Sequence, residues 1–223
     1  MTVAERVDTV RERIANAARR AGRDPAEIRL VAATKTQPVR VIAEVLAAGV
    51  RDLGENRAQE LVAKAPELAP LDPVWHFIGR LQRNKINQLA PWVSCWQTVD
   101  RVELAEALAA RVDSTTVLVE VNVGAEPQKG GCGVQEVRPL VDHLRDLGVS
   151  VVGLMTVAPA GVDPRPAFAS LRTLATSCEL AELSMGMSGD FEAAIGEGAT
   201  IVRIGTGLFG MRPTFHQFQH PGR

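Results

Sequence analysis

The sequence predicts an α/β protein that forms a single (β/α)8 TIM-type barrel with an extra helix at its amino terminus. Two observations lead to this fold class. Eight short apolar runs alternate with longer helix-like segments, and eight such repeats fit the 223 residues of the chain. Most of these runs are continuously apolar, which is typical of parallel strands covered by helices. An open doubly wound sheet would use fewer strands, and no G-x-G-x-x-G motif follows the first run.

The extra helix is predicted over residues 2–21. Its apolar side chains recur every three or four positions, at Val3, Val7, Val10, Ile14, Ala17 and Ala21. Thr2 and Glu5 have the spacing of a capping box, and Gly22 is placed to end the helix. Charged residues of both signs fill the other face, which indicates a solvated surface.

The barrel elements follow in order along the chain. The predicted strands are 29–34, 51–54, 74–79, 95–99, 116–123, 150–157, 182–187 and 199–205. The predicted helices are 38–48, 57–65, 83–90, 101–111, 134–147, 164–178 and 189–195. We therefore expect one domain over residues 1–213, followed by a flexible tail over 214–223 that lacks periodicity.

Composition excludes several classes of protein. There are 25 basic and 26 acidic residues, so the formal net charge of -1 gives no general attraction to nucleic acid or to an anionic membrane. The apolar stretches are too short to span a bilayer, and the charged start is unlike a signal peptide. Three cysteines without close spacing argue against a disulfide framework or a zinc cluster. We expect a soluble protein of a reducing cytoplasm.

Polar residues gather where the predicted strands end. Lys35 follows the first strand, Asn56 the second and Ser188 the seventh, while residues 203–206 end the eighth. In a parallel barrel the carboxyl ends of the strands form the functional face. These residues are therefore expected to converge on one mouth of the barrel.

Lys35 is the candidate nucleophile. An ammonium at the end of a buried strand is expected to be partly desolvated, which lowers the pKa of the amine and favours imine formation with a carbonyl. The structural alternative is a lysine that reaches the rim or pairs with Glu55. Position alone leaves both readings open.

The turns after strands seven and eight have features of a phosphate site. Ser188 has the position of a helix N-cap, and Gly205, Gly207 and Gly210 make the last turn glycine-rich. An ordinary capped helix and a flexible loop are the alternative. A lysine facing a phosphate site suits pyridoxal phosphate, and it equally suits an aldolase that forms an imine with a sugar phosphate.

Five motifs favour the first reading: VAATKTQP, DLGENRAQE, WHFIGRLQRNK, LSMGMSGDFEAAI and ATIVRIGTGLFGMR. In this order and spacing, between about Leu30 and Arg212, they closely resemble the pyridoxal phosphate homeostasis proteins, also called proline synthase co-transcribed homologues. The resemblance implies a barrel similar to the N-terminal domain of alanine racemase, with pyridoxal 5′-phosphate held as an aldimine on Lys35. It also implies cofactor-binding roles for Asn56 near the cofactor, for Arg203 facing the pyridine nitrogen, and for Ser188, Gly205 and Thr206 on the phosphate.

The resemblance further implies a monomer that buffers pyridoxal phosphate or delivers it to apo-enzymes, without evident turnover. An arginine only donates hydrogen bonds, so a pyridine nitrogen facing Arg203 would stay unprotonated and would stabilise carbanions weakly. The sequence contains no tyrosine, which excludes a two-base racemase that uses one. A pyridoxal phosphate enzyme with weak one-base chemistry by Lys35 is the alternative. Lys129, in EPQKGGCG, is similar to a secondary cofactor contact of the family, and Met155 and Met187 are candidates for the ring pocket.

Overall fold

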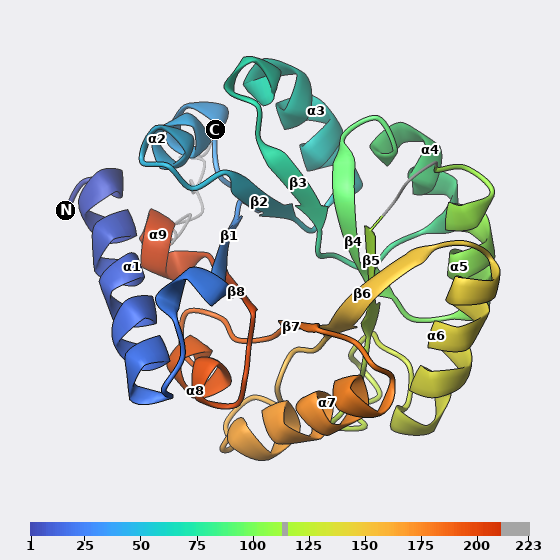
Figure 1. Cartoon of the computed structure of the whole chain (residues 1–223). Coiled ribbons are helices and arrows are strands. Elements are labelled where there is room, and N and C mark those ends of the chain that lie inside the picture. Colours follow the sequence, from blue (N-terminus) through green and yellow to red (C-terminus); the bar gives the residue numbers. More distant parts are fainter. Residues whose placement is uncertain (113–115, 211–223) are drawn as a thin grey trace, which may run out of the picture.

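The computed structural model of the chain is a closed barrel of eight parallel strands surrounded by helices (Figure 1). It describes residues 1–112 and 116–210. Neighbouring strands pair in sequence order, and the last strand pairs with the first to close the barrel. This confirms the predicted fold class. The tail predicted over residues 214–223 lies outside the described residues.

The strands and helices occupy nearly the positions that the sequence predicts. The strands are β1 (Arg29–Ala33), β2 (Asp52–Glu55), β3 (Val74–Phe77), β4 (Val93–Val99), β5 (Thr116–Glu120), β6 (Ser150–Met155), β7 (Glu182–Ser184) and β8 (Ile201–Ile204). The helices are α1 (Val3–Arg20), α2 (Val39–Ala47), α3 (Ala58–Leu68), α4 (Ile86–Leu89), α5 (Val102–Ala109), α6 (Val137–Asp146), α7 (Arg165–Ser177), α8 (Phe191–Gly196) and α9 (Thr206–Phe209). Short 3-10 turns lie at Pro25–Glu27, Ala69–Leu71, Arg83–Lys85 and Val134–Glu136.

Several differences lie at the carboxyl ends of the strands. β7 ends at Ser184, three residues before the predicted end, because Gly186 adopts a φ of 92° and turns the chain towards α8. The sequence analysis predicted no helix after β8, yet a single turn, α9, forms there.

The amino-terminal helix α1 completes the outer ring. Thr2 and Glu5 form the predicted capping box, and the apolar stripe of the helix is buried. β8 is followed only by the one-turn α9, so α1 packs beside α8, α9 and α2 and covers this sector of the barrel (Figure 1).

The barrel interior contains both apolar and polar side chains. The main core lies between strands and helices, and a second buried cluster comprises Val31, Cys95, Leu118, Met155 and Ile201. Alternate residues of a strand face opposite sides of a sheet, so this second cluster fills the barrel axis. Other buried side chains of the barrel are polar, among them His76, Gln97, Ser184 and Arg203. The interior therefore departs from the usual filling with branched apolar side chains.

Three features of the described residues bear on the class of protein. None of the helices is at once long enough and apolar enough to cross a bilayer. The three cysteines are buried and carry free thiols. Burial raises the pKa of both Cys95 and Cys132 to about 12, so these thiols stay protonated at neutral pH. Nowhere in residues 1–112 or 116–210 do three potential metal ligands gather.

Candidate functional site

A cavity of about 240 Å³ lies at the carboxyl-terminal mouth of the barrel. It is lined by Ala33, Lys35, Gly54, Asn56, Ile78, Val157, Met187 and Arg203. Three of the six residues that the sequence analysis selected therefore line one cavity, and they come from the ends of β1, β2 and β8. A second cavity, of about 540 Å³, shares Val157 and Met187 with the first.

Lys35 lies in the turn beyond β1. The expectation that this amine is partly desolvated is wrong for the protein alone, because the strand ends at Ala33 and leaves Lys35 exposed. Of the two structural alternatives, a lysine that reaches the rim or one that pairs with Glu55, the pairing is wrong, because Glu55 pairs with Lys64. Thr36, the next residue, has a φ of 64°, which is strained for a β-branched side chain.

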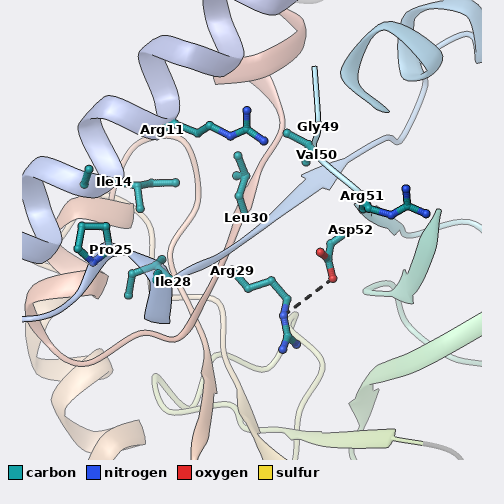
Figure 2. Close-up of a pocket in the computed structure, with 12 residues that line it drawn as sticks. Arg11, Ile14, Pro25, Ile28, Arg29, Leu30, Gly49, Val50, Arg51 and Asp52 are labelled. Carbon is teal, nitrogen blue, oxygen red and sulfur yellow. Dashed lines mark ion pairs between the residues drawn. The ribbon is translucent and has the colours of Figure 1, made fainter. Parts of the chain in front are cut away.

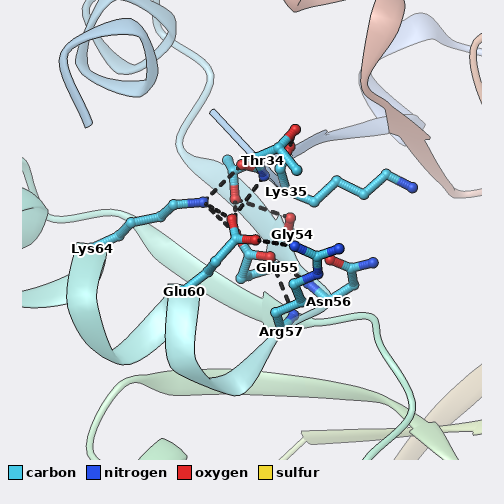
Figure 3. Close-up of polar contacts among 9 residues, drawn as sticks. Thr34, Lys35, Gly54, Glu55, Asn56, Arg57, Glu60 and Lys64 are labelled. Carbon is cyan, nitrogen blue, oxygen red and sulfur yellow. Dashed lines mark hydrogen bonds and ion pairs between the residues drawn. The ribbon is translucent and has the colours of Figure 1, made fainter. Parts of the chain in front are cut away.

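A buried polar network fixes the backbone on both sides of Lys35 (Figure 3). Lys64 Nζ lies 2.7 Å from a carboxylate oxygen of Glu55 and donates to the carbonyl oxygen of Thr34 at 2.9 Å. It also binds Glu60 at 2.7 Å, and the same Glu60 oxygen accepts from Thr36 N at 2.7 Å. The Lys35 side chain points away from this network (Figure 3). The network therefore holds the strained turn and leaves the Lys35 amine free.

The sequence analysis missed Lys64 and Glu60. A usable signal existed, because Lys64 occupies the buried face of α3 between Leu61 and Leu68, where a charged residue needs a partner. Burial alone would raise the pKa of the Glu60 carboxyl. Hydrogen bonds from Lys64 and from the backbone of Thr36 outweigh burial and hold that pKa below its usual value.

Asn56 presents an unused acceptor. Its backbone N–H donates to Glu55 at 2.8 Å, while its side-chain Oδ1 is buried and has no hydrogen-bond partner among the described residues. A Cβ built on Gly79 would come within 2.0 Å of the Asn56 carbonyl oxygen, so only glycine lets the chain after β3 pass this close. A buried acceptor without a donor is unfavourable.

Arg203 is a fixed cation in the cavity wall. It is 5 % exposed, and its guanidinium donates to Ser184 Oγ at 2.6 Å and to the Thr156 carbonyl oxygen at 2.8 Å. Burial lowers the pKa of Arg203 to about 10, although Glu120 and Asp190 partly oppose this. Arg203 therefore remains charged at neutral pH and can only donate hydrogen bonds.

The other three selected residues lie beside this cavity and are not among the residues that line it. Ser188 Oγ accepts a hydrogen bond from Gly207 N at 3.2 Å, which ties the turn after β7 to the turn after β8. Gly205 lies against Ala33, since a Cβ built on it would be 3.6 Å from that residue. Thr206 is exposed at the start of α9.

The assignment of Ser188 as a helix N-cap is wrong. α8 begins at Phe191, and Asp190 is its N-cap residue. The Asp190 side chain accepts from Met187 N at 2.6 Å and so organises the turn in which Ser188 lies. This leaves the Ser188 hydroxyl facing the turn after β8.

Glu120, which the sequence analysis did not select, ends β5 and lines a small cavity of about 130 Å³ that also contacts Lys129 and Val157. Burial and, after it, the charge of Asp100 raise the pKa of Glu120 to about 7, although Arg203 and Arg80 oppose the rise. The signal in the sequence was a glutamate at the end of the apolar run TVLVE.

We expect Glu120→Gln to change how stability depends on pH. A carboxyl whose pKa rises from 4.5 in the unfolded chain to about 7 in the fold stabilises the protein below pH 4.5, and this contribution is lost as the pH rises through 7. The variant should therefore gain stability relative to wild type between pH 4.5 and 8, by at most roughly 3 kcal/mol. Urea unfolding at both pH values measures the difference, with Glu103→Gln on the exposed face of α5 as the control. A difference that is equal at the two pH values would contradict the assignment.

Lys129 and the two methionines differ in their relation to the cavities. Lys129 Nζ donates to the carbonyl oxygen of Ala158, in the loop after β6, at 2.9 Å, and its charge is paired with Glu126 of its own loop after β5. Met187 lines the 240 Å³ cavity, whereas Met155 is buried in the inner cluster of the barrel.

Comparison with known proteins gives consistent matches over nearly the whole chain. The family model for the alanine racemase N-terminal domain matches residues 6–213. The pyridoxal phosphate homeostasis protein of Pseudomonas aeruginosa is 43% identical over 221 residues, covering 95% of this chain and 96% of the relative. The protein of the same name from Aquifex aeolicus is 45% identical over 226 residues, covering 95% and 99%.

Solved structures agree with these matches. The structure of PipY from Synechococcus elongatus with pyridoxal phosphate bound has a TM-score of 0.81 and 34% identity, and the alignment covers 94% of this chain and all of that one. Alanine racemase from Corynebacterium glutamicum is 16% identical with a TM-score of 0.64, over 94% of this chain and 62% of that one. This second likeness concerns the fold alone.

Proposed function

Since the chain belongs to the pyridoxal phosphate homeostasis protein family, whose barrel is the alanine racemase N-terminal domain, we propose that it binds pyridoxal 5′-phosphate covalently through Lys35 and serves in the homeostasis of that cofactor. The relatives carry this name, and the PipY structure contains the cofactor. The proposal for this chain adds which residues hold the cofactor and how.

One observation carries the proposal: a free lysine amine, an asparagine side chain and a fixed cationic donor line the same cavity. These are Lys35, Asn56 and Arg203. When bound, the cofactor supplies an aldehyde carbon that condenses with a lysine amine, with loss of one water. Lys35 supplies the amine, the Asn56 side-chain amide forms a hydrogen bond with the cofactor, and Arg203 donates to a ring acceptor at the cavity wall.

Ser188, Gly205 and Thr206 are proposed to bind the phosphate group. The hydrogen bond from Gly207 N to Ser188 Oγ holds the two turns together, and Gly205 lies next to Ala33 on the edge of the cavity. Hydroxyl groups and free backbone N–H groups on two adjacent turns are suited to an anion.

We further propose that the protein is a carrier without turnover, which acts as a monomer in the cytoplasm and passes the cofactor to apo-enzymes. Arg203 stays charged and donates only, so it cannot keep a pyridine nitrogen protonated. Without that proton the ring is a weak electron sink. The sequence also lacks the tyrosine that a two-base racemase would require.

A second function, weak amino-acid chemistry on the same cofactor, is favoured by one observation. Glu120 lines the 130 Å³ cavity, which shares Val157 with the cavity that contains Lys35, and its pKa of about 7 suits an acid that both gives and takes a proton near neutral pH. In this case Lys35 and Glu120 would be the two proton-transferring groups.

Two measurements on the loaded protein test these functions. Borohydride reduction followed by peptide mass spectrometry should locate the cofactor adduct on Lys35; an adduct on another lysine would refute the assignment. Mixing with a panel of amino acids should give at most one equivalent of product. Sustained product formation that Glu120→Gln abolishes would instead establish the enzyme.

A further inference from the structure

A continuous chain of hydrogen-bonded side chains runs through the barrel from its amino-terminal end to Arg203. Arg203 Nη1 lies 2.6 Å from Ser184 Oγ, which lies 2.6 Å from Gln97 Oε1. Gln97 Nε2 lies 2.8 Å from His76 Nδ1, and His76 Nε2 lies 2.9 Å from Asp52 Oδ1. The first four residues are at most 5 % exposed. The five residues come from five different strands.

The far end of this chain reaches solvent. Asp52 begins β2 and lines a pocket of about 460 Å³ between α1 and the amino-terminal ends of the first two strands (Figure 2). Its side chain is 25 % exposed, and Arg29 lies 3.9 Å away as a long ion pair (Figure 2). The row of hydrogen-bonded side chains therefore has a partly exposed carboxylate at one end and a buried guanidinium at the other.

The chemistry of the two ends fixes the direction of every hydrogen bond. Arg203 can only donate, so Ser184 Oγ accepts from it and gives its own proton to Gln97 Oε1. The Gln97 amide must then donate to His76 Nδ1. His76 therefore carries its proton on Nε2 and donates it to Asp52.

This arrangement admits only one tautomer of His76, with the ring proton on Nε2. A proton on Nδ1 would require the Gln97 amide to turn over and present its oxygen to His76. The Ser184 hydroxyl would then face two donors, Arg203 and the Gln97 amide, and its proton would lose its acceptor. A buried donor left unpaired is unfavourable, so the chain as a whole selects one tautomer and one set of rotamers.

Polar residues at these inward positions are unusual, because barrel interiors are normally filled by branched apolar side chains. Together, these hydrogen-bonded side chains hold Arg203 in a single orientation. Ser184 holds one terminal nitrogen of its guanidinium and the Thr156 carbonyl holds the other. Arg203 also lines the cavity that contains Lys35.

We infer that His76, Gln97 and Ser184 are positioning residues that hold Arg203 as a fixed donor in the cavity wall, with Asp52 anchoring the tautomer of His76. The consequence for cofactor binding rests on the function proposed above. The orientation of Arg203 does not depend on that function, and it can be measured in the protein without any ligand.

The first experiment determines, in protein without cofactor, which groups donate and which accept in this row of hydrogen bonds. In protein labelled with nitrogen-15 histidine, His76 should show an unprotonated Nδ1 and a protonated Nε2 at neutral pH. Its signal among the four histidines is assigned by its loss in His76→Gln. Gln97→Glu, which cannot donate to Nδ1, should place a proton there. A protonated Nδ1 in the wild-type protein would overturn the inference.

The second experiment follows Arg203 itself. In protein labelled with nitrogen-15 arginine, slow rotation of a held guanidinium should give separate signals for its terminal N–H groups. Ser184→Ala removes one acceptor and should merge them. Met155→Leu is the matched control, because it changes another buried residue of the barrel interior by a nearly isosteric substitution and should leave them separate. Merged signals in the wild type would overturn the inference.

The same pair of variants tests the effect on the cofactor. Ser184→Ala should weaken pyridoxal phosphate binding about tenfold, as for loss of one hydrogen bond to a charged group. It should also shift the absorption maximum of the bound cofactor, while Met155→Leu changes neither. If the two variants had equal effects, the hydrogen-bonded side chains would have a structural role only. If the wild-type protein binds no cofactor, the proposed function fails. The two nitrogen-15 experiments then still decide whether the hydrogen-bonded side chains orient Arg203.

Discussion

Replacement of Lys35 by alanine should abolish covalent attachment of pyridoxal phosphate and leave the fold intact. Lys35 is exposed, and no hydrogen bond or ion pair within the described part of the chain involves its ammonium. The neighbouring backbone is held by Lys64 and Glu60 instead, through Thr34 and Thr36. The variant should therefore unfold within about 0.5 kcal/mol of wild type, as is usual for an exposed side chain.

The measurement is the absorption band of the imine after addition of cofactor, followed by borohydride reduction and intact mass. Lys85→Ala, on the turn before α4, controls for unspecific reaction of lysines and should retain the band. Ser188→Ala should also retain it while weakening affinity by roughly 1–3 kcal/mol, the effect of a lost hydrogen bond to a charged group. A reduced adduct of unchanged yield on the Lys35→Ala protein would exclude Lys35 as the attachment site.

Periodicity was sufficient to predict the barrel, because helices and buried strands differ in the spacing of apolar residues. It failed for α9, where two glycines flank and a third interrupts the four-residue turn Thr206–Phe209. Local propensity disfavours a helix there, and packing against α1 overrides it. It also misplaced the N-cap of α8, since Ser188 and Asp190 are both suitable cap residues and only the observed turn distinguishes them.

The part of the site that strand ends supply could be predicted from order along the chain. Lys35, Asn56 and Arg203 follow from the rule that parallel strands end at one face. The supporting residues could not be predicted in this way. Lys64 contacts Glu55 across a strand-to-helix packing interface, and the His76–Gln97 contact joins two strands whose relative register the sequence does not reveal. Strand parity nevertheless places His, Gln and Ser at inward positions, and this is the signal to use in related sequences.

Lys64→Met should be the most destabilising of the substitutions considered. Lys64 Nζ binds Glu55, Glu60 and the Thr34 carbonyl oxygen, all within 2.9 Å. Glu55 is fully buried, so loss of the lysine leaves a carboxylate without its cation. Breaking a buried pair by removing one partner destabilises by about 3–5 kcal/mol, whereas replacing both partners is often nearly neutral.

Urea unfolding of three variants at neutral pH tests this. Lys64→Met should show the full loss, and Lys64→Met combined with Glu55→Gln should recover most of it, because no buried charge then lacks a partner. Arg138→Met, which breaks an ion pair with Asp142 whose two side chains are more than half exposed, should change stability by less than about 1 kcal/mol. If the double variant were as unstable as Lys64→Met, the loss would come from packing of the lysine stem rather than from an uncompensated charge. The turn that carries Lys35 would then depend on the shape of α3 and not on the ion pair.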